Sequence, residues 1–332
     1  MQRFQSILQF KKVSCKNCYK CVRNCPVKAI RVHDHQARII ESQCIYCEKW
    51  ILVCPQDAKE EQNMIPAIRS AMENKAQVIA SLHPAYLARF GVTGINKTRE
   101  AMKKLGFADV ADAAEGASLM TAQYRALFPE QKELGVMISS ACPVIVQLIK
   151  KHYPHLLGNL VQSASMMQFH ANYLKKQYPK ARIVYVSPCI SVMSELREPG
   201  NEVDYVITLE ELAAMFAAQN IDPNEMADNE QDGSIYGKGF AQSGGVSGAV
   251  MRVLEEEGCD LSVSCKKCTG AKECKKALMI LNVGRLPENL VEGMACEGGC
   301  IDGPASILSH QRIVKNRDKL LKNADQRTIT EN

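Results

Sequence analysis

Fifteen cysteines, most of them clustered, constrain this 332-residue chain more than any other feature. One group lies within residues 15–54 and another within residues 259–300, while Cys142 and Cys189 stand alone between them. The N-terminus has too short an apolar stretch for a signal peptide, and a reducing compartment keeps thiols free for metal or redox chemistry. We therefore expect a cytoplasmic protein whose cysteines bind metal, not one held by disulfides.

Charge and hydropathy argue against two classes of partner. The chain has 41 Lys and Arg against 36 Asp and Glu, a formal net charge of +5, and these charges are spread along its length. Such a balance predicts no nucleic-acid surface. No apolar run reaches the ~18 residues that a transmembrane helix needs, so we expect no membrane partner. With 46% apolar residues, a chain of this length can bury about two ordinary domain cores.

The first cysteine group has the spacing of bacterial ferredoxins. The segment CKNCYKCVRNCP separates its cysteines by two, two and three residues and ends in proline. In that pattern three thiolates bind one [4Fe–4S] cluster and the fourth crosses to a second cluster. A second run, CIYCEKWILVCP, matches except that Trp50 stands where the third cysteine belongs. Cross-ligation then predicts one complete [4Fe–4S] cluster on Cys15, Cys18, Cys21 and Cys54.

The second ferredoxin site keeps only Cys25, Cys44 and Cys47, because tryptophan cannot ligate iron. It could hold a three-iron cluster, a four-iron cluster with a water or non-thiolate ligand, or no cluster, and we favour a cluster of one kind or the other. A zinc or disulfide knuckle is disfavoured by the two tandem runs with both prolines. We expect residues 1–62 to form an α+β ferredoxin-like domain, and residues 60–75 to form a helical connector.

From residue 76 the pattern alternates between short apolar runs and amphipathic stretches, which is typical of α/β architecture. Thr208 and Glu211 form a capping-box pattern at the start of one predicted helix. Cys142 and Cys189 each directly follow a predicted strand. Ligands bind at the carboxyl ends of parallel strands, so these two cysteines are expected to converge. The predicted strands lie in AQVIASLHP, LGVMISSACP, ARIVYVSPC and VDYVIT, and the helices in PVIVQLIKKHYP, SASMMQFHANYLKKQYP and LEELAAMFAAQ.

Three segments resemble, in order and spacing, the signature segments of the [FeFe]-hydrogenase catalytic domain. They are SSACPVIVQLIKKHYPHLLGNL, VSPCISVMSE and VEGMACEGGCIDGP. AEGASL and SGGVSGAVMRVL also look like pieces of this family. The resemblance covers about residues 76–310, and it implies that residues 63–332 form a two-lobed α/β domain that holds the H-cluster.

By this resemblance, four cysteines hold the cubane half of the H-cluster, and Cys300 also bridges to a diiron subcluster with CO, cyanide and a bridging dithiolate. Met294 matches a methionine packed against the diiron unit, and Pro84 is kept near the cofactor pocket. Ser187 replaces a family methionine, and Ser187 or Ser191 is expected to supply a hydrogen bond to cyanide. The four implied cubane ligands are Cys142, Cys189, Cys296 and Cys300.

Departures from the high-turnover members concern proton transfer. Ala141 stands where those enzymes have a proton-shuttling cysteine, and Ser118 and Val161 replace a glutamate and a serine of their proton path. Only Glu115 of that path remains, and Val192 replaces a lysine that hydrogen-bonds cyanide. Methyl groups cannot relay protons. A positioned proton donor commonly contributes ~10²–10⁴ in rate, so we expect slow turnover.

The Ser-Ala-Cys-Pro signature is similar to branches of the family associated with sensing. The resemblance therefore implies a sensor-type [FeFe]-hydrogenase that slowly and reversibly oxidises H₂ to two protons and two electrons, which pass through the ferredoxin-type clusters. Its implied partners are a redox protein such as ferredoxin, a separate signalling protein, and the maturation proteins that make the diiron unit. Two alternatives stay open: a metabolic hydrogenase with a proton path through Glu115 and water, and an iron–sulfur electron-transfer or assembly protein of the same fold without the diiron subcluster.

A further group of four cysteines follows residue 258. Two of them have the x2 spacing common in zinc and iron–sulfur sites, so one interpretation is that the group binds zinc or a further iron–sulfur cluster. In the other interpretation Cys274 packs on a helix and the rest are loop thiols. Residues 312–332 are expected to form a polar helix and tail. The four cysteines of this group are Cys259, Cys265, Cys268 and Cys274.

Overall fold

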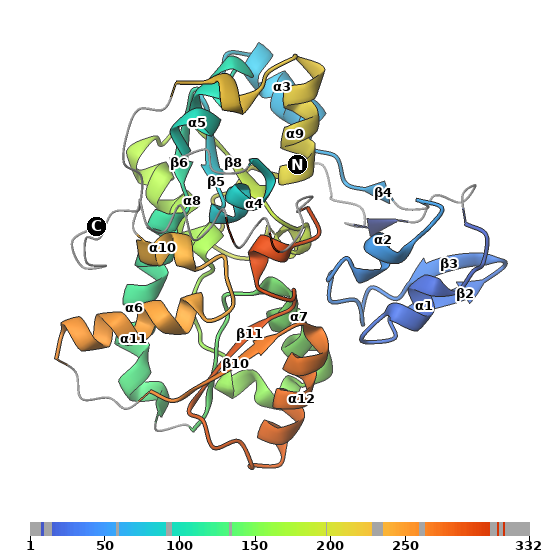
Figure 1. The fold of residues 1–332 in the computed structure, drawn as a ribbon, viewed down its shortest axis with the longest axis vertical. Coiled ribbons are helices and arrows are strands. Elements are labelled where there is room, and N and C mark those ends of the chain that lie inside the picture. The colour runs from blue at the N-terminus through green and yellow to red at the C-terminus, as the bar shows by residue number, and fades with distance from the viewer. Residues whose placement is uncertain are drawn as a thin grey trace.

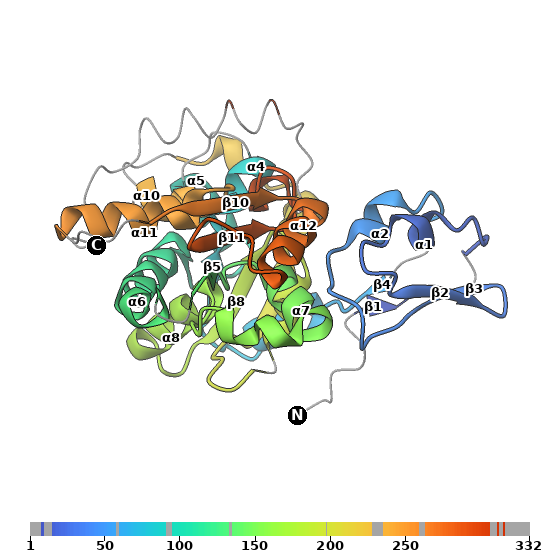
Figure 2. The same ribbon diagram turned by 90° about the horizontal axis from the view of Figure 1, so that it is seen from below.

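The N-terminal unit lies beside the rest of the chain in both views of the computed structural model (Figures 1 and 2). The structure describes residues 8–9, 15–57, 60–90, 95–132, 135–196, 198–227, 235–258 and 263–305, with positions 311 and 315. The strands of this unit form two antiparallel pairs, β2 with β3 and β1 with β4, and helix α1 packs on α2. The elements are β1 (Leu8–Gln9), α1 (Lys20–Asn24), β2 (Ile30–His33), β3 (Gln36–Ile39), α2 (Lys49–Val53) and β4 (Glu60–Glu61).

Both cysteine runs in this unit adopt the same backbone conformation. Asn17 and Tyr19 have φ of 53° and 57°, and the equivalent Tyr46 and Glu48 both have φ of 56°. Left-handed conformations at non-glycine residues are uncommon, so their recurrence at matching positions indicates an internal repeat. The loop around each pair of cysteines is thereby folded alike, although the two sequences differ at Trp50.

A four-stranded parallel sheet forms the first lobe of the remaining chain, in the order β6-β5-β8-β9. All five residues of β5 are buried, as expected for a strand covered by helices on both faces. The predicted capping box is confirmed, because Thr208 accepts from the Glu211 amide and Glu211 accepts from the Thr208 amide. The elements are α3 (Ile65–Glu73), β5 (Val78–Leu82), η1 (Pro84–Tyr86), α4 (Leu87–Phe90), α5 (Ile95–Lys104), β6 (Asp109–Asp112), α8 (Met166–Gln177), β8 (Arg182–Ser187), η3 (Ser191–Glu195), β9 (Tyr205–Thr208), α9 (Leu209–Ala218) and η4 (Pro223–Glu225).

A three-stranded parallel sheet, ordered β10-β11-β7, forms the second lobe, which lies below the first in Figure 1. Helix α6 packs on α8 of the first lobe and on α11 of the second, so it joins the two. The elements are α6 (Ala114–Lys132), β7 (Met137–Ile138), α7 (Pro143–His152), η2 (Pro154–Asn159), α10 (Ile235–Gly239), α11 (Gly245–Glu256), β10 (Cys265–Thr269), α12 (Ala271–Asn282), β11 (Leu290–Met294) and η5 (Cys300–Asp302).

Some predicted boundaries differ from the structure. The strand expected in LGVMISSACP has only two residues, and the connector is helical only over Ile65–Glu73, because Pro66 lies at the start of that helix and residues 60–61 pair with β1. The predicted polar helix and tail, residues 312–332, lies outside the described residues apart from position 315. Among the described helices, none is long and apolar enough to cross a membrane.

Cations on helices of the second lobe bind backbone carbonyls of the N-terminal unit. Lys151 donates to the carbonyl of Cys44 at 2.6 Å and lies 4.6 Å from the centre of the Tyr46 ring. Lys275 on α12 donates to the carbonyl of Pro26 at 2.9 Å. These bonds attach both ferredoxin-type runs to the second lobe.

His83 gives the fold a measurable pH dependence. It is 5% exposed, and its Nδ1 accepts from the Ala85 amide at 2.9 Å, so burial lowers its pKa to about 3 from an ordinary value near 6.5. Below pH 6.5 the unfolded chain binds a proton that the folded chain does not, and stability falls as pH drops toward 3. Between pH 6 and pH 5, we expect the free energy of unfolding of the wild type to fall by about 1 kcal/mol more than that of His83→Asn, in which asparagine keeps a hydrogen-bond acceptor. Urea unfolding of both proteins measures this, and equal losses would contradict it.

Candidate metal centre

A cavity lies where strands of both sheets end. Cys142 follows β7, Cys189 follows β8, and Cys296 and Cys300 follow β11. All four line this cavity, which encloses about 400 Å³ between protein atoms. The convergence predicted for Cys142 and Cys189 therefore extends to the two cysteines of the last segment. Within the second lobe it follows from the parallel register, since the carboxyl ends of neighbouring strands share one edge. Cys189 comes from the other sheet, whose strand β8 ends at the same cavity.

Glycines let the backbone approach the cavity closely. Gly299 has φ of +97°, and a Cβ there would lie 2.6 Å from the Gln242 carbonyl carbon and the Ser243 amide nitrogen. A Cβ on Gly303 would lie 2.9 Å from the Pro188 carbonyl oxygen. Residues with side chains do not fit at either position, so the loop that carries Cys300 depends on both glycines.

Loss of hydration dominates the electrostatics of the four thiols. Burial raises the pKa of Cys142, raises that of Cys189 to about 12, and raises those of Cys296 and Cys300 well above their usual value. Negative charge on neighbouring thiols raises the pKa of Cys189, Cys296 and Cys300 further, and negative charge on Glu195 raises that of Cys142. The free thiols are therefore neutral at physiological pH, and a metal that binds them must displace protons.

The N-terminal unit supplies part of the cavity wall through Tyr46, Cys47 and Glu48. Glu48 is buried, and its Oε1 accepts from the amide of Ile190 at 2.6 Å. That bond holds the loop after Cys189 against the second ferredoxin-type run. Tyr46 and Glu48 were not predicted from the sequence, because they face the cavity only through the packing of the unit against the second lobe.

Other residues implied by the resemblance fall at different places around the cavity. Met294 and Ser191 line it, and the Ser191 Oγ lies 2.9 Å from the Cys189 Sγ. Ser187 is buried, and its Oγ accepts from the Cys189 amide, so it shapes the ligand loop. Pro84 is buried in η1, and Ala141 immediately precedes Cys142 at the start of α7.

Glu115 lies at the surface, with 52% of its side chain exposed. Its Oε2 is 3.7 Å from Nε2 of the buried His170, whose Nδ1 lies 2.7 Å from Oγ of the buried Ser81. Its predicted role in proton transfer stays a prediction.

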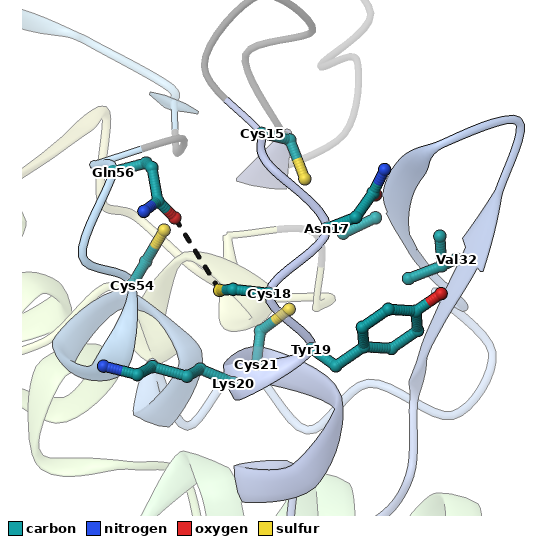
Figure 3. A pocket seen from close by; sticks show the side chains of 10 residues that line it. Cys15, Asn17, Cys18, Tyr19, Lys20, Cys21, Val32, Cys54 and Gln56 are labelled. Carbon is teal, nitrogen blue, oxygen red and sulfur yellow. Dashed lines mark hydrogen bonds between the residues drawn. The ribbon is translucent and has the colours of Figure 1, made fainter.

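A second pocket lies in the N-terminal unit (Figure 3). The sulfur atoms of its four cysteines gather around one space of about 360 Å³, and the Cys18 thiol donates to Gln56 Oε1 at 3.7 Å. Cys54 comes from the far end of the second run, so this is the grouping that cross-ligation predicts. The cysteines are Cys15, Cys18, Cys21 and Cys54.

The three cysteines left for the second ferredoxin-type site are also near one another. Negative charge on Cys25 raises the pKa of both Cys44 and Cys47, although burial is the larger cause for each. Trp50 is only 4% exposed and belongs to the core on which Cys25 and Cys44 pack. The tryptophan thus fills volume beside this site, and Cys47 also lines the larger cavity.

In the described part of the extra cysteine group, the thiols of Cys268 and Cys274 interact, whereas Cys265 does not join them. Cys265 and Cys268 lie on strand β10, where residues three apart point to opposite faces, and the expectation of loop thiols was wrong for both. Cys274 is 2% exposed on α12, as the packed-thiol interpretation predicts, and its thiol donates to the Met294 carbonyl at 3.5 Å. Cys259 lies outside the described residues.

The family model described as "Iron only hydrogenase large subunit, C-terminal domain" matches residues 76–304. The chain belongs to the iron-only hydrogenase family. The match spans both sheets and the cavity between them, and it leaves out the N-terminal unit.

Known hydrogenases show how far this family member has diverged. Iron hydrogenase 1 of Clostridium pasteurianum is 26% identical over 326 residues, which cover 84% of this chain and 53% of that protein. The chain therefore spans about half the length of that relative. The periplasmic [Fe] hydrogenase large subunit of Nitratidesulfovibrio vulgaris is 25% identical over 361 residues, covering 89% and 85%. A structure of a HydA1 variant from Chlamydomonas reinhardtii superposes with a TM-score of 0.65 at 21% identity, covering 80% of this chain and 91% of that one.

The residues of this iron-only hydrogenase family member fit a thiolate-ligated iron cluster. Four thiols on three separate loops surround the cavity. Because Gly299 has no side chain, its loop can pack against the backbone at Gln242 and Ser243. Within the described residues, no three Cys, His, Asp or Glu side chains form a group that could hold a single metal ion. Thiols spread around a cavity suit a group of several irons, and thiolate is the ligand such clusters require.

Gly299→Ala is expected to disrupt the cavity in this hydrogenase-family chain. The added Cβ overlaps the backbone at Gln242, and alanine disfavours φ of +97°, so we expect a loss of roughly 1–3 kcal/mol in unfolding free energy and less iron per chain. Gly248→Ala is the matched control, because a Cβ there meets nothing within 4 Å. Iron analysis and thermal unfolding of both variants give the comparison. Full iron content in Gly299→Ala would contradict the expectation.

Cross-ligation predicts that substituting either of two cysteines far apart in the sequence removes the same cluster. Cys54→Ala and Cys21→Ala should remove the same iron–sulfur signal, whereas Cys25→Ala should leave that signal intact. Electron paramagnetic resonance of the reduced variants separates the two sites. If Cys25→Ala abolished the signal that Cys54→Ala removes, the four cysteines shown in Figure 3 would not be the complete ligand set of one cluster.

Proposed function

We propose that this chain is a sensor-type [FeFe]-hydrogenase of low turnover, which reversibly oxidises H₂ to two protons and two electrons. The observation that carries the proposal is the convergence of Cys142, Cys189, Cys296 and Cys300 on one cavity in a chain of the iron-only hydrogenase family. The four thiols would hold the cubane of an H-cluster, with Cys300 shared with the diiron subcluster. When bound, that cofactor supplies an iron with an open position for hydrogen and a cubane that stores and relays electrons.

The contribution of the protein itself begins with positioning. Ser187 accepts from the Cys189 amide and Glu48 from the Ile190 amide, so the loop that follows β8 is held from two sides. Met294 presents an apolar, polarisable side chain to the cavity at the end of β11.

Electrons would leave through the N-terminal unit. Cys47 lines the cavity and also lies close to Cys25 and Cys44, so a cluster at the second ferredoxin-type site would lie next to the metal centre. The complete set around Cys54 lines a separate pocket of the unit, and we propose that an external redox protein such as ferredoxin receives electrons there. We propose residues 1–62 as the electron-transfer domain and residues 63–332 as the catalytic domain.

Slow turnover follows from the groups around Cys142. Ala141 offers a methyl group where a fast enzyme of this resemblance carries a thiol, and Val161 is buried without a polar atom in its side chain. A chain that binds H₂ but converts it slowly suits a report to a signalling protein. That partner, the maturation proteins and a cytoplasmic location remain parts of the proposal.

Infrared spectroscopy tests the proposal directly. Protein supplied with the diiron cofactor should show sharp CO and cyanide bands that shift when H₂ is added, because no amino acid absorbs there. Protein with a fully loaded cubane but no such bands would instead be an iron–sulfur electron-transfer or assembly protein of this fold.

Ala141→Cys is expected to raise hydrogen turnover of the loaded protein by ~10²–10⁴, because it restores a thiol that can carry a proton beside Cys142. Ala217→Cys is the control, since Ala217 is exposed on α9 and does not line the metal cavity. Turnover is measured at equal iron content. An unchanged rate in Ala141→Cys would mean that proton supply at this position does not limit the wild type.

A further inference from the structure

A second, larger hollow adjoins the metal cavity. It encloses about 930 Å³ between protein atoms and is open to solvent, and Pro143 belongs to the walls of both spaces. Since Pro143 directly follows Cys142, only the start of helix α7 separates the hollow from the metal centre. We call this space the α7 cleft. It lies between α7, the segment 160–165 and the turn η3 that follows Cys189.

The α7 cleft has a polar wall in an otherwise apolar part of the lobe. Ser165 Oγ donates to Glu195 Oε2 at 2.5 Å, and Ser163 Oγ donates to Gln123 Oε1 at 2.8 Å. At the rim, Lys150 pairs with Glu198 at 2.8 Å, and both side chains are 41% exposed. A hollow of this size lined by hydroxyls and carboxylates holds water.

The inner end of the cleft meets a chain of buried hydroxyl groups. Ser140 lines the cleft, and its Oγ lies 3.0 Å from the Tyr124 hydroxyl, which also lies 3.1 Å from Ser139 Oγ. Ser139 Oγ accepts from the Ala141 amide at 3.3 Å. These hydroxyls reach from the cleft to the residue next to Cys142. Hydroxyl groups both donate and accept, so they can pass a proton where the methyl of Ala141 cannot.

We propose that the α7 cleft is the proton inlet of the metal centre, with Glu195 exchanging protons between cleft water and the hydroxyl groups beside Cys142. The inference rests on the proposed function. During hydrogen oxidation a proton leaves the centre, is accepted by a Glu195 carboxylate and is released to cleft water, which restores the carboxylate. Hydrogen formation runs the same transfers in reverse, and no other reactant is required.

The electrostatics of Glu195 suit this exchange. Its surroundings together raise its pKa to about 7. Loss of hydration is the main cause, the negative charge of Glu198 adds to it, and the Ser165 hydrogen bond and Lys150 oppose it. Among the described residues that line the cleft, the charged ones are Lys150, Glu195 and Glu198. A carboxyl group with a pKa near 7 is populated in both protonation states at neutral pH, which is the condition for efficient proton transfer.

The inlet also accounts for the residues that the chain lacks. Val161, which stands at a proton-path position in the resemblance, lines the α7 cleft, so the hydroxyl missing from its side chain is replaced by space for water. Glu115, by contrast, lies 3.7 Å from His170 and lines neither hollow. The cleft thus offers a route that does not require Glu115.

Glu195→Gln tests the inlet first without the diiron cofactor. In wild-type protein that carries its iron–sulfur clusters, the infrared absorption of one protonated carboxyl group should titrate with a midpoint near pH 7. This absorption should disappear in Glu195→Gln and persist in Glu198→Gln, the matched variant at the rim. A band that persists in Glu195→Gln would overturn the assignment of Glu195 as the exchanging group.

Turnover of the cofactor-loaded proteins then separates this inference from the proposed function. We expect Glu195→Gln to keep the CO and cyanide bands, lose at least about tenfold in hydrogen turnover and lose the pH dependence near 7, with Glu195→Asp restoring part of the rate. Glu202→Gln, which alters an exposed glutamate outside the cleft wall, should stay within about twofold of the wild type. Loaded Glu195→Gln with wild-type turnover would overturn the inlet and leave the hydrogenase proposal standing. A wild type without CO and cyanide bands would overturn the hydrogenase proposal itself.

Discussion

The convergence of four thiols on one poorly hydrated cavity is the constraint on which the rest of this structure depends. Burial raises the pKa of each thiol, so without a metal the thiols are neutral and can be buried at little electrostatic cost. Binding of a metal displaces their protons and makes them ligands. Each thiol lies on a loop after a parallel strand, and the loops must meet without filling the cavity. Gly299 and Gly303 satisfy that requirement at the point where the backbones are closest.

Two approaches to the cavity have different chemistry. On one side, Cys47 and Glu48 bring the N-terminal unit against the loop after Cys189, and thiols continue from there toward Cys54. On the other side, the α7 cleft brings solvent and the Glu195 carboxylate to the start of α7. The thiol-lined side and the α7 cleft thus reach the cavity from different elements, the N-terminal unit and the start of α7.

Local patterns predicted much of this arrangement. The ferredoxin spacing with its prolines, the capping box at Thr208 and the apolar runs of β5, β8 and β9 depend on residues close in sequence, and the structure has them. The x2 spacing of Cys265 and Cys268 was misleading, because the same spacing that closes a metal knuckle in a turn separates two side chains on a strand. Periodicity also overestimated β7, whose short pairing ends where the chain turns toward Cys142.

The sequence by itself determined which functional groups the chain has available: thiols in ferredoxin-type runs, thiols after strands, and a methyl group at Ala141. Only the tertiary structure decided which of them share a space, because that depends on two parallel sheets presenting their carboxyl ends to one cavity and on the N-terminal unit closing one side of it. Glu195 illustrates the difference. Its sequence neighbours do not distinguish it from the other glutamates. Its pKa near 7 arises mainly from loss of hydration, with Glu198 raising the pKa and Ser165 and Lys150 lowering it, in surroundings that come together only in the folded chain.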